Sequence, residues 1–466
     1  MTFVEARGGG PWYTVAWSAN SNADSKKHAS NKSNSCFPRS RGVPKDNLGS
    51  RMFQDGIAVI GLGYIGLPTC AALAVRGTTV KGVDVNQDIV EGINAGRVTL
   101  VEPDLEALVQ SAVQQGYLTA TTEVPHANAF LIAVPTPFKS DYHPDLSYVM
   151  AATEAIAPML RGGEVVILES TSPPGTTIQI SHWLAELRPD LTFPHQDNFP
   201  DIHIAHCPER VLPGRIMTEI VTNDRIVGGI TRRCAERAAE VYEIFCEGGI
   251  LLTDASSAEM AKLVENSFRD VNIAFANELA AVCERIELDV WEVIKLANRH
   301  PRVNILKPGP GVGGHCIAVD PWFIVAAAPE ESRIIRTARE VNDARPSRIV
   351  ESVLKLAERF DHPAIACLGL AFKADVDDLR ESPALSITAS IAKQLPGSSI
   401  FAVEPHTNSL PPALRHLDNV TLLDVEDALF ASEIIVLLVD HTEFRALSPM
   451  QWQEKQVIDT RGIWRR

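Results

Sequence analysis

Short apolar runs separated by helical stretches recur along the chain from Phe53 onward. The first run is Ile57–Ile60; after a glycine turn, a stretch of small apolar residues at Pro68–Val75 leads to a second run at Thr79–Val83. Short apolar runs of this kind on either side of a helix are typical of a βαβ unit. Further runs follow at Phe130–Val134, Val165–Leu168 and His203–Ala205. The pattern predicts a doubly wound, parallel sheet that continues to about residue 230.

The alternation stops in the middle of the chain and then resumes. Ser257–Leu288 contains neither proline nor glycine and predicts one long helix, and a shorter helix is expected to start near Val290. From about residue 348 the apolar runs are Ile365–Leu370, Ser399–Val403, Ile434–Val439 and Val457–Asp459. We therefore predict an α/β fold with two Rossmann-like, doubly wound parallel-sheet domains joined by a central helical connector. The expected ranges are 53–240 for the first domain, 241–345 for the connector and 346–466 for the second domain.

Residues 1–52 differ from the rest of the chain. The stretch Ser18–Cys36 is rich in serine, asparagine and lysine and has no apolar periodicity, and no continuous apolar segment with a cleavage signature is present. We predict a disordered extension; a targeting segment is the alternative.

Composition and charge narrow the classes of function. The chain has 466 residues, of which 45% are hydrophobic and 22% charged, and its longest aliphatic run, Ile434–Val439, is far shorter than a membrane span of about 20 residues. A net charge of −15 argues against general nucleic-acid binding. The eight cysteines include no C-x-x-C pair, which indicates neither a disulfide framework nor a zinc site. We expect a cytoplasmic protein with no metal and no nucleic-acid or membrane partner.

The turn after the first predicted strand is a candidate cofactor site. Its G-x-G-x-x-G spacing, between a strand and a helix, permits a tight turn and brings a pyrophosphate close to the helix N-terminus. Asp84 ends the next strand, where a carboxylate accepts ribose hydroxyls and repels a 2′-phosphate, so NAD is expected rather than NADP. A glycine-rich turn without a ligand is the alternative. The expected contacts in the turn are Gly61, Gly63, Tyr64, Ile65 and Gly66.

Two further strand ends carry polar loops. Thr136 follows the run that ends at Val134, and Thr171 follows the run that ends at Leu168. Ligands of open parallel sheets bind beyond the carboxyl ends of the strands, so both threonines are candidate cofactor contacts. Turn chemistry alone explains each of them equally well.

The segment Pro308–Cys316 places a cysteine after a glycine-rich loop that a substrate can approach closely. A helix starting near Pro321 and nearby cations are expected to lower the pKa of the Cys316 thiol, and the resulting thiolate would attack an aldehyde. Asp320 and the Gly-Gly-His sequence before Cys316 favour this interpretation over an inert buried cysteine. We apply the inert interpretation to Cys70, Cys234, Cys246, Cys283 and Cys367.

Three further groups of polar residues are ambiguous by themselves. Lys262, Asn266 and Arg269 form one stripe on the long helix, either a catalytic group or a solvated face. The pair Glu209–Arg210 follows a predicted strand and is either functional or a surface ion pair. The loop Gly369–Pro383 supplies cations for a diphosphate and an aromatic ring for stacking, or is simply a charged loop.

Six segments occur in the order GLGYIGLP, VPTP, CPER, the helix Lys262–Asn277, GVGGHC and GLAFKADVDDLRESP. With them, the chain resembles the UDP-glucose/GDP-mannose dehydrogenase family from about Phe53 to its C-terminus. Within this family, ILESTSPPGT, CPERVLPG, ENSFRDVNIAFANEL and ANRHPRVNILKPGPGVGGHCIAVDPWF are similar to UDP-N-acetyl-D-mannosamine dehydrogenases.

The resemblance implies roles for individual residues. It implies that Cys316 is the nucleophile, that Lys262 is an acid/base or oxyanion partner, that Asn266 and Asp320 assist through water, and that Glu209 takes part in thioester hydrolysis. It also implies that Arg380 contacts the cofactor and that the protein is a homodimer in which Arg302 or its neighbours act on the partner's site. The implied substrate contacts are Arg210, Val211, Lys262, Asn266, Arg269, His300, Arg302, Gly313, Phe372 and Lys373.

The reaction implied by the resemblance is the NAD-dependent, four-electron oxidation of C6 of UDP-N-acetyl-D-mannosamine to the uronate, for surface polysaccharide biosynthesis. It would proceed through a thiohemiacetal and a thioester on Cys316. UDP-N-acetylglucosamine or UDP-glucose is the alternative substrate. A one-step hydroxyacid dehydrogenase and a catalytically silent nucleotide-binding protein are the alternatives of other classes.

Overall fold

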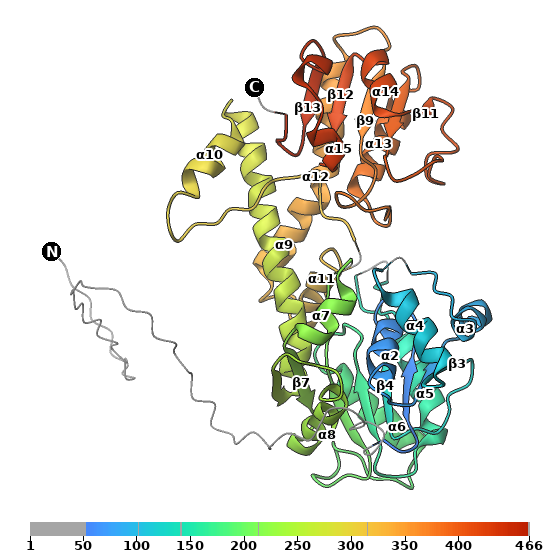
Figure 1. Cartoon of the computed structure of the whole chain (residues 1–466). Helices are drawn as coiled ribbons and strands as arrows, with labels where there is room; N and C mark the ends of the chain where they lie inside the picture. The colour runs from blue at the N-terminus through green and yellow to red at the C-terminus, as the bar shows by residue number, and fades with distance from the viewer. Residues whose placement is uncertain (1–52, 101, 140–141, 213, 315, 465–466) are drawn as a thin grey trace, which may run out of the picture. The chain divides into compact units, whose positions relative to one another are not determined.

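The computed structural model describes residues 53–464 except 101, 140–141, 213 and 315, and the described residues belong to one compact unit (Figure 1). The predicted N-terminal extension, residues 1–52, lies outside the described residues.

An eight-stranded sheet forms the first domain, with the strand order β3-β2-β1-β4-β5-β6-β7-β8. Its strands pair in parallel except for β6 and β7, which are antiparallel. The sheet therefore extends to Asp254, beyond the predicted end near residue 230. The strands are β1 (Ile57–Ile60), β2 (Val80–Val83), β3 (Leu118–Thr121), β4 (Ala129–Ile132), β5 (Val165–Leu168), β6 (His203–His206), β7 (Arg225–Gly229) and β8 (Ile250–Asp254).

The glycines of β7 explain why its sequence did not predict a strand. A Cβ on Gly228 would lie 2.4 Å from the carbonyl oxygen of Asp254, and one on Gly229 would lie 2.3 Å from that of Thr231. Glycine weakens a strand in isolation, so it marks positions where another backbone approaches closely. Here the neighbouring chain segments demand glycine, and tertiary contacts outweigh the weak local preference.

Helices cover both faces of this sheet, which confirms the doubly wound prediction. Side chains alternate along a strand, so Ile57 and Val59 of β1 point into one apolar core while Ala58 and Ile60 point into the other. Helices α2, α3, α4 and α8 pack on the first face, and α5 and α6 pack on the second. The helices are α2 (Gly66–Ala74), α3 (Gln87–Asn94), α4 (Leu105–Gln114), α5 (Ser147–Ile156), α6 (Thr176–Leu187), α7 (Ile216–Thr222) and α8 (Arg232–Tyr242), with a 3₁₀ turn at Ala157–Met159.

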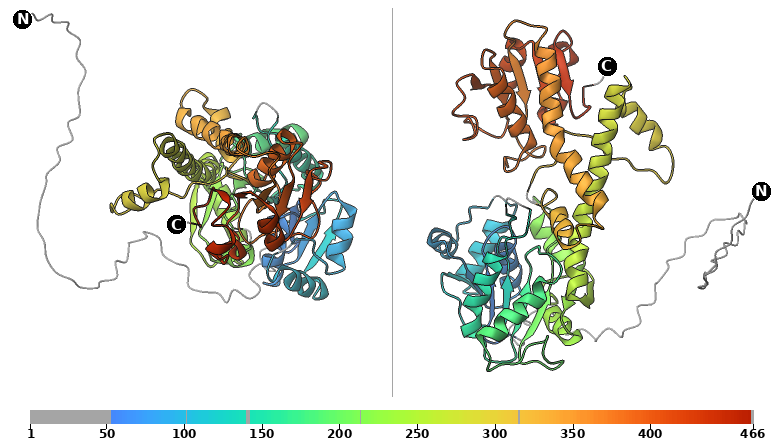
Figure 2. Two further views of the ribbon diagram at one scale, coloured as in Figure 1. Left: turned by 90° about the horizontal axis from the view of Figure 1, so that it is seen from above. Right: turned by 180° about the vertical axis from the view of Figure 1, so that it is seen from behind.

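Four helices form the connector. The predicted long helix is α9 (Ala255–Arg285), and Asp254 caps it by accepting a hydrogen bond of 2.9 Å from the Ser257 N–H. Helices α9 and α12 lie side by side (Figure 2), and a buried ion pair of 2.6 Å between Asp270 and Arg339 joins them. The others are α10 (Val290–Ala297), α11 (Asp320–Ala327) and α12 (Arg333–Ala357). Pro346 lies inside α12, so the predicted boundary at 345/346 falls within a helix.

A five-stranded parallel sheet with the order β11-β10-β9-β12-β13 forms the second domain. Apolar cores lie on both of its faces. The elements are β9 (Ile365–Leu368), α13 (Pro383–Gln394), β10 (Ile400–Val403), β11 (Val420–Leu422), α14 (Val425–Ala431), β12 (Ile434–Leu437), α15 (Thr442–Arg445), a 3₁₀ turn at Pro449–Gln451 and β13 (Gln456–Asp459). This order repeats that of β3-β2-β1-β4-β5, and the predicted fold class of two Rossmann-like domains with a helical connector is confirmed.

Within the described part of the chain, every helix is too short or too polar to pass through a lipid bilayer.

Candidate active site

The glycine turn between β1 and α2 has the backbone geometry that a dinucleotide requires. Gly61 has φ +93°, and a Cβ there would lie 2.7 Å from the Ala133 carbonyl oxygen. A Cβ on Gly66 would lie 1.8 Å from the Gly61 carbonyl oxygen, whereas one on Gly63 would meet no protein atom within 4 Å. The backbone at Gly63 is therefore open to a ligand, while its neighbours close the turn.

Asp84 connects the end of β2 to this turn. Its Oδ2 accepts the Leu62 N–H at 2.9 Å, and its Oδ1 accepts the Asn86 N–H at 2.9 Å. The side chain is half-buried, so its carboxylate retains lone pairs for ribose hydroxyls. The structure thus places Asp84 beside the glycine turn, as the sequence predicted.

The two predicted threonines lie in loops that contact each other. The Thr136 hydroxyl donates a hydrogen bond of 2.5 Å to the Thr171 carbonyl oxygen, and the Ser170 hydroxyl donates one of 2.6 Å to Val134. These bonds join the loops at the carboxyl ends of β4 and β5. Both threonines therefore lie at the sheet edge that carries the glycine turn.

Arg380, from the loop after β9, reaches the glycine turn of the first domain. Its Cζ lies 4.8 Å from the centroid of the Tyr64 ring, within the range of a cation–π contact. Its guanidinium also binds the Asp378 carboxylate at 2.6 Å. Arg380 therefore lies beside the glycine turn, and its contact with the cofactor stays a prediction.

A second cluster forms around Cys316. The Asn266 amide donates a hydrogen bond of 2.5 Å to Asp320 Oδ2, and the Asp320 N–H donates one of 2.9 Å to the Cys316 carbonyl oxygen. Lys262 lies one turn before Asn266 on α9 and interacts electrostatically with both Asp320 and Cys316. Among the described cysteines, Cys316 is exposed and the others are buried. The structure thus brings four predicted catalytic residues together.

The predicted lowering of the Cys316 pKa is wrong. Surrounding protein atoms raise the pKa of this thiol, and the nearby Asp320 carboxylate raises it further, against the opposing effect of Lys262 and Arg380. Helix α11 begins with Asp320 itself, so a negative charge lies at the helix end that was expected to stabilise the thiolate. Cys316 therefore needs a proton acceptor before it can act as a nucleophile.

Asp320 has the properties of such an acceptor. Its side chain is 3% exposed, and burial raises its pKa to about 6, although Lys262 and the Asn266 hydrogen bond oppose this shift. A carboxylate with this pKa is ionised at neutral pH and is a stronger base than an ordinary aspartate.

The glycine loop before Cys316 packs against the second domain. A Cβ on Gly313 would lie 2.7 Å from the Glu381 carbonyl oxygen and 2.9 Å from Phe372 Cβ. At the base of the loop, the Gly309 N–H donates a hydrogen bond of 2.9 Å to Oδ1 of Asn277 on α9. The sequence interpretation attributed these glycines to substrate approach; at Gly313 the space is filled by protein instead, and Phe372 is half-buried there.

Glu209 is held by the first domain. Its carboxylate forms an ion pair of 3.0 Å with Arg225, and both side chains are buried. Arg225 in turn lies over the Tyr242 ring, 5.0 Å from its centroid. These partners belong to the first domain, and the role of Glu209 in thioester hydrolysis stays a prediction. Its neighbour Arg210 pairs with Glu265 of α9 at 2.6 Å, so Glu209 and Arg210 do not form the surface ion pair of the alternative interpretation. Val211 is half-buried.

The remaining predicted substrate contacts lie on the surface. Arg269 is on an exposed face of α9, and Lys373 is exposed in the loop after β9. His300 and Arg302 are exposed after α10, where the Arg302 N–H donates to His300 Nδ1 at 3.3 Å. Their substrate contacts stay predictions.

The sequence interpretation missed Arg461 and Glu169. Arg461 follows β13, binds Asp440 at 2.7 Å and would lie 2.7 Å from a Cβ on Gly309. The strand-end rule was the available signal for it. Glu169 is buried, and its carboxylate accepts a hydrogen bond of 2.8 Å from the Tyr242 hydroxyl. Burial raises the pKa of Glu169 to about 7. No local pattern marks a residue whose environment comes from distant elements.

A dinucleotide turn with its acid, an exposed cysteine in a helical connector and a second Rossmann-like domain define an NAD-dependent dehydrogenase with two nucleotide-binding domains. Family models agree: the NAD binding domain of the UDP-glucose/GDP-mannose dehydrogenase family matches residues 55–246, its central domain 256–344 and its UDP binding domain 366–466. The chain belongs to the UDP-glucose/GDP-mannose dehydrogenase family. The predicted family and the predicted cofactor, NAD, are thereby confirmed, and the protein is a nucleotide-sugar dehydrogenase.

Individual relatives cover nearly the same length. The chain is 59% identical over 409 residues, 88% of this chain and 96% of the relative, to an NDP-N-acetyl-D-galactosaminuronic acid dehydrogenase of Ralstonia nicotianae. It is 53% identical over 418 residues, 88% of this chain and 99% of the relative, to a UDP-N-acetyl-D-mannosamine dehydrogenase of Escherichia coli K12. A solved UDP-N-acetyl-mannosamine dehydrogenase, Cap5O of Staphylococcus aureus, has a TM-score of 0.77 and 40% identity, and the match covers 87% of this chain and 95% of that one.

Replacing Asp84 with asparagine should weaken NAD binding selectively. The amide oxygen can keep only one of the two backbone hydrogen bonds, from the Leu62 N–H or from the Asn86 N–H. The negative charge that favours ribose hydroxyls and repels a 2′-phosphate is lost. We expect the KM for NAD to rise roughly tenfold or more, the equivalent of one hydrogen bond to a charged group, and the preference for NAD over NADP to fall. Steady-state rates with both cofactors measure this, and the KM for the sugar nucleotide is the control. An unchanged KM for NAD would contradict the assignment.

Proposed function

We propose that this protein oxidises the C6 hydroxymethyl group of UDP-N-acetyl-D-mannosamine to the carboxylate, with two NAD consumed per sugar. The observation that carries the proposal is the convergence of Cys316, Asp320, Asn266 and Lys262 in the connector between an NAD-binding and a UDP-binding domain. The choice of sugar is supported by relatives 53–54% identical that are named UDP-N-acetyl-D-mannosamine dehydrogenases.

The first oxidation needs a proton acceptor and a cation at the C6 hydroxyl. We assign water held by Asp320 and Lys262 as the acceptor, since the raised pKa of Asp320 gives a base that is ionised at neutral pH. The Lys262 ammonium stabilises the negative charge that develops on the C6 oxygen as the proton leaves. NAD held at the glycine turn would supply the hydride acceptor, and loss of the hydride from C6 leaves an aldehyde.

The second oxidation needs the thiol. Cys316 loses its proton to the adjacent carboxylate or its water and adds to the aldehyde carbon, forming a thiohemiacetal that still carries one hydrogen on that carbon. A second hydride leaves this carbon for a second NAD, and a thioester remains. Water then cleaves the carbon–sulfur bond, which releases the acid and restores the thiol. We keep Glu209 as the predicted residue for hydrolysis, and surface polysaccharide synthesis in the cytoplasm as the proposed context.

A second candidate substrate comes from the relatives with the higher identity. The two Ralstonia proteins, 59% identical, are named NDP-N-acetyl-D-galactosaminuronic acid dehydrogenases. That name favours a nucleotide-linked N-acetylgalactosamine sugar as the alternative, beside the UDP-N-acetylglucosamine and UDP-glucose of the sequence interpretation. The same mechanism applies to each of these sugars, because the C6 alcohol is common to them.

Comparing the four UDP-sugars tests both candidates. We expect UDP-N-acetylmannosamine to have the highest kcat/KM and to yield two NADH per sugar consumed, with the uronate identified by mass spectrometry. One NADH per sugar would contradict the double oxidation. A higher kcat/KM for UDP-N-acetylgalactosamine would replace the proposed sugar and leave the mechanism in place.

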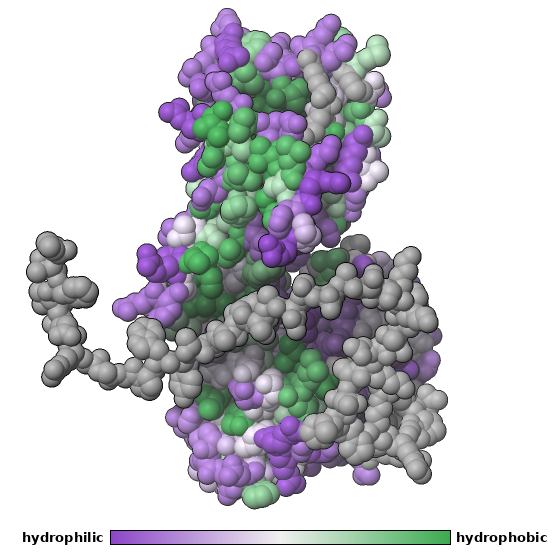
Figure 3. All heavy atoms as spheres, turned by 90° about the vertical axis from the view of Figure 1, so that its left-hand side faces the viewer, coloured by the Kyte–Doolittle hydropathy of each residue, from purple (hydrophilic) through white to green (hydrophobic). Residues whose placement is uncertain are grey.

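We also propose that the protein is a homodimer that pairs through the connector. An apolar groove between α9 and α12 is lined by Phe275, Ile334 and Val341, and Phe275 and Ile334 are 58% and 72% exposed. Figure 3, viewed from the side on which α10 lies in Figure 1, shows hydrophobic residues gathered in patches on that face of the molecule. A second copy of the chain is the occupant we propose, and it would place Arg302 near the partner's site.

Replacing Phe275 with aspartate should dissociate this dimer. An aromatic anchor at an interface contributes about 2–4 kcal/mol, so the dissociation constant should rise by at least about 30-fold. Light scattering after gel filtration measures the change. Phe430→Asp is the matched control, because Phe430 lies on α14 and is 88% exposed. A wild-type protein that is monomeric at micromolar concentration would refute the proposal.

A further inference from the structure

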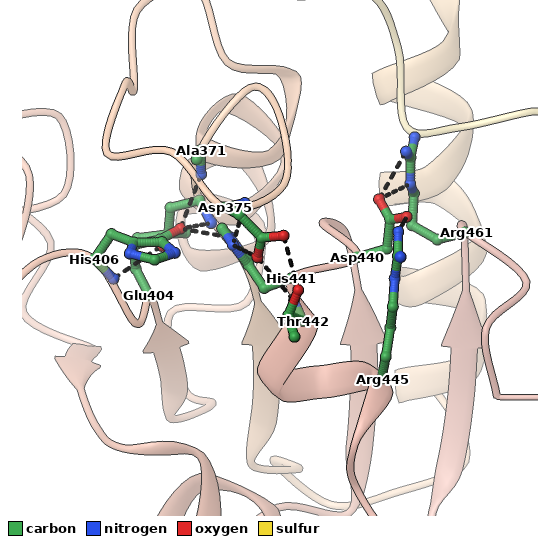
Figure 4. Close-up of polar contacts among 10 residues, drawn as sticks. Ala371, Asp375, Glu404, His406, Asp440, His441, Thr442, Arg445 and Arg461 are labelled. Carbon is green, nitrogen blue, oxygen red and sulfur yellow. Dashed lines mark hydrogen bonds and ion pairs between the residues drawn. The ribbon is translucent and has the colours of Figure 1, made fainter. Parts of the chain in front are cut away.

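Glu404 lies directly after β10, and its carboxylate is fully buried. Its Oε2 accepts the Leu370 N–H at 2.7 Å and the Ala371 N–H at 3.0 Å, and its Oε1 accepts the His406 N–H at 3.2 Å (Figure 4). Leu370 and Ala371 begin the loop 369–382, which connects β9 to α13. One carboxylate therefore ties the start of this loop to the end of the neighbouring strand.

His441 secures the middle of the same loop. Its Nδ1 accepts the Asp375 N–H at 3.0 Å, so the ring proton lies on Nε2, which faces Glu404 Oε2 at 3.3 Å. The Asp375 carboxylate accepts hydrogen bonds of 2.8 Å from both the N–H and the hydroxyl of Thr442. Burial by itself would raise the pKa of Glu404, but the bonds from His441 and the loop outweigh it and lower that pKa. The hydrogen bonds to Glu404 thus favour its ionised carboxylate and hold it in one geometry.

In the first domain, the glycine turn after β1 contacts Asp84 through a backbone N–H, as the loop after β9 contacts Glu404. The two carboxylates differ in their exposure. Asp84 is half-buried and open on the ligand side, whereas Glu404 is sealed beneath His441. In the second domain the acid therefore orders the loop, and the loop's own side chains face the ligand. In the first domain, the Gly61 N–H donates to the Val83 carbonyl oxygen at 2.8 Å and the Leu62 N–H to the Asp84 carboxylate at 2.9 Å. In the second domain, the Gly369 N–H donates to the Val403 carbonyl oxygen at 2.8 Å and the Leu370 N–H to the Glu404 carboxylate at 2.7 Å.

Three residues, His441 among them, could instead form a cation-binding site. Asp375, His406 and His441 each have a ligand atom within 4.8 Å of the others. However, His441 Nδ1 already accepts the Asp375 N–H, and its Nε2 faces the Glu404 carboxylate. A cation on His441 would have to displace the Asp375 N–H or separate Nε2 from the buried Glu404 carboxylate, which carries a large desolvation cost. The hydrogen-bonded arrangement is therefore the one that the geometry supports.

We propose that Glu404 and His441 are positioning residues for the UDP-sugar: they hold the loop 369–382 so that Phe372 and Lys373 meet the nucleotide. The inference rests on the proposed function for the identity of the sugar, but its core concerns binding of the UDP portion. Neither residue touches the substrate in this account. Each acts through the backbone of the loop.

Binding of UDP alone tests the proposal on the full-length protein. In Glu404→Gln, the amide nitrogen would face either the His406 N–H or the N–H groups of Leu370 and Ala371. The loop should therefore loosen, and the dissociation constant for UDP should rise roughly tenfold. His441→Ala should have a similar effect. His441→Gln, whose amide nitrogen occupies the Nε2 position and can still donate to Glu404, should restore most of the UDP affinity. Isothermal titration with UDP and, separately, with NAD measures both sites.

Asp84→Asn is the reciprocal control, since it should weaken NAD binding and leave UDP binding within about twofold. Unchanged UDP affinity in Glu404→Gln would overturn the proposal. A parallel loss of UDP affinity, NAD affinity and thermal stability in both Glu404→Gln and His441→Ala would also overturn it, because it would show a purely structural role. If the wild-type protein bound UDP but did not oxidise UDP-N-acetylmannosamine, the proposed sugar would fail while this test remained valid.

Discussion

A Cys316→Ala enzyme is expected to stop at the aldehyde. Without the thiol no thiohemiacetal forms, so the second hydride has no favourable donor and complete oxidation should slow by about a thousandfold or more, as in other enzymes that lose their nucleophile. The measurement is NADH formed per UDP-N-acetylmannosamine consumed, together with trapping of the aldehyde by a hydrazine. We expect two NADH per sugar for the wild type and no more than one for the variant.

Cys283→Ala is the control for the loss of a thiol. Cys283 lies on the same connector but is 2% exposed, so its replacement should reduce stability slightly and leave the stoichiometry at two. Two NADH per sugar from Cys316→Ala at an undiminished rate would refute covalent catalysis, whereas one NADH per sugar from the wild type would favour the one-step hydroxyacid-dehydrogenase alternative.

Asp320→Asn should reduce kcat by about a hundredfold to ten-thousandfold, the usual contribution of a general base. The wild-type kcat should fall about tenfold per pH unit below pH 6, because burial raises the pKa of Asp320 to about 6 and the protonated form cannot accept a proton. The variant should lose this acid limb. A pH profile of kcat for both proteins measures the effect, and a wild-type rate that is flat between pH 5 and 7 would contradict the assignment.

The same substitution should stabilise the fold at pH 8. The folded pKa of Asp320 lies above the unfolded value of about 4, so the stability from this group is present at low pH and is lost as pH rises through about 6. At pH 8 the buried charge costs up to about 3 kcal/mol, since each pKa unit corresponds to about 1.4 kcal/mol. Asparagine can keep the acceptor for Asn266 without the charge, so the midpoint of thermal unfolding should rise.

Asp440→Asn is the control, because we expect it to change the unfolding midpoint in the opposite direction. The bonds from Arg461 and Arg445 lower the pKa of Asp440 although burial opposes them, so its ionised form stabilises the fold above its ordinary pKa. Removing that charge should lower the unfolding midpoint at pH 8. A lower midpoint for Asp320→Asn as well would show that the Lys262 interaction outweighs the cost of burying the Asp320 carboxylate.

The sequence by itself determined the architecture, because hydrophobic periodicity is a local property. Ile57–Ile60 and Val165–Leu168 form the strands that their apolar runs predicted, and Val290 begins a helix as expected. The glycine turn and Asp84 were also predictable, since both are defined by backbone geometry within one βαβ unit. Weakly apolar segments such as Arg225–Gly229 escaped prediction because their strand conformation depends on neighbouring segments.

Only the tertiary structure decided the electrostatics of the site and the partners of its buried groups. The pKa of Cys316 is raised because folding removes part of the thiol's hydration and places Asp320 beside it, whereas sequence proximity to a helix suggested the opposite. Glu209 pairs with Arg225, and Glu404 contacts His441; in each case the two residues come from different strands of the sheet or from the loops that follow them. Burial and charge pairing arise from residues far apart in the chain, so these properties appear only when the sheets and connector are assembled.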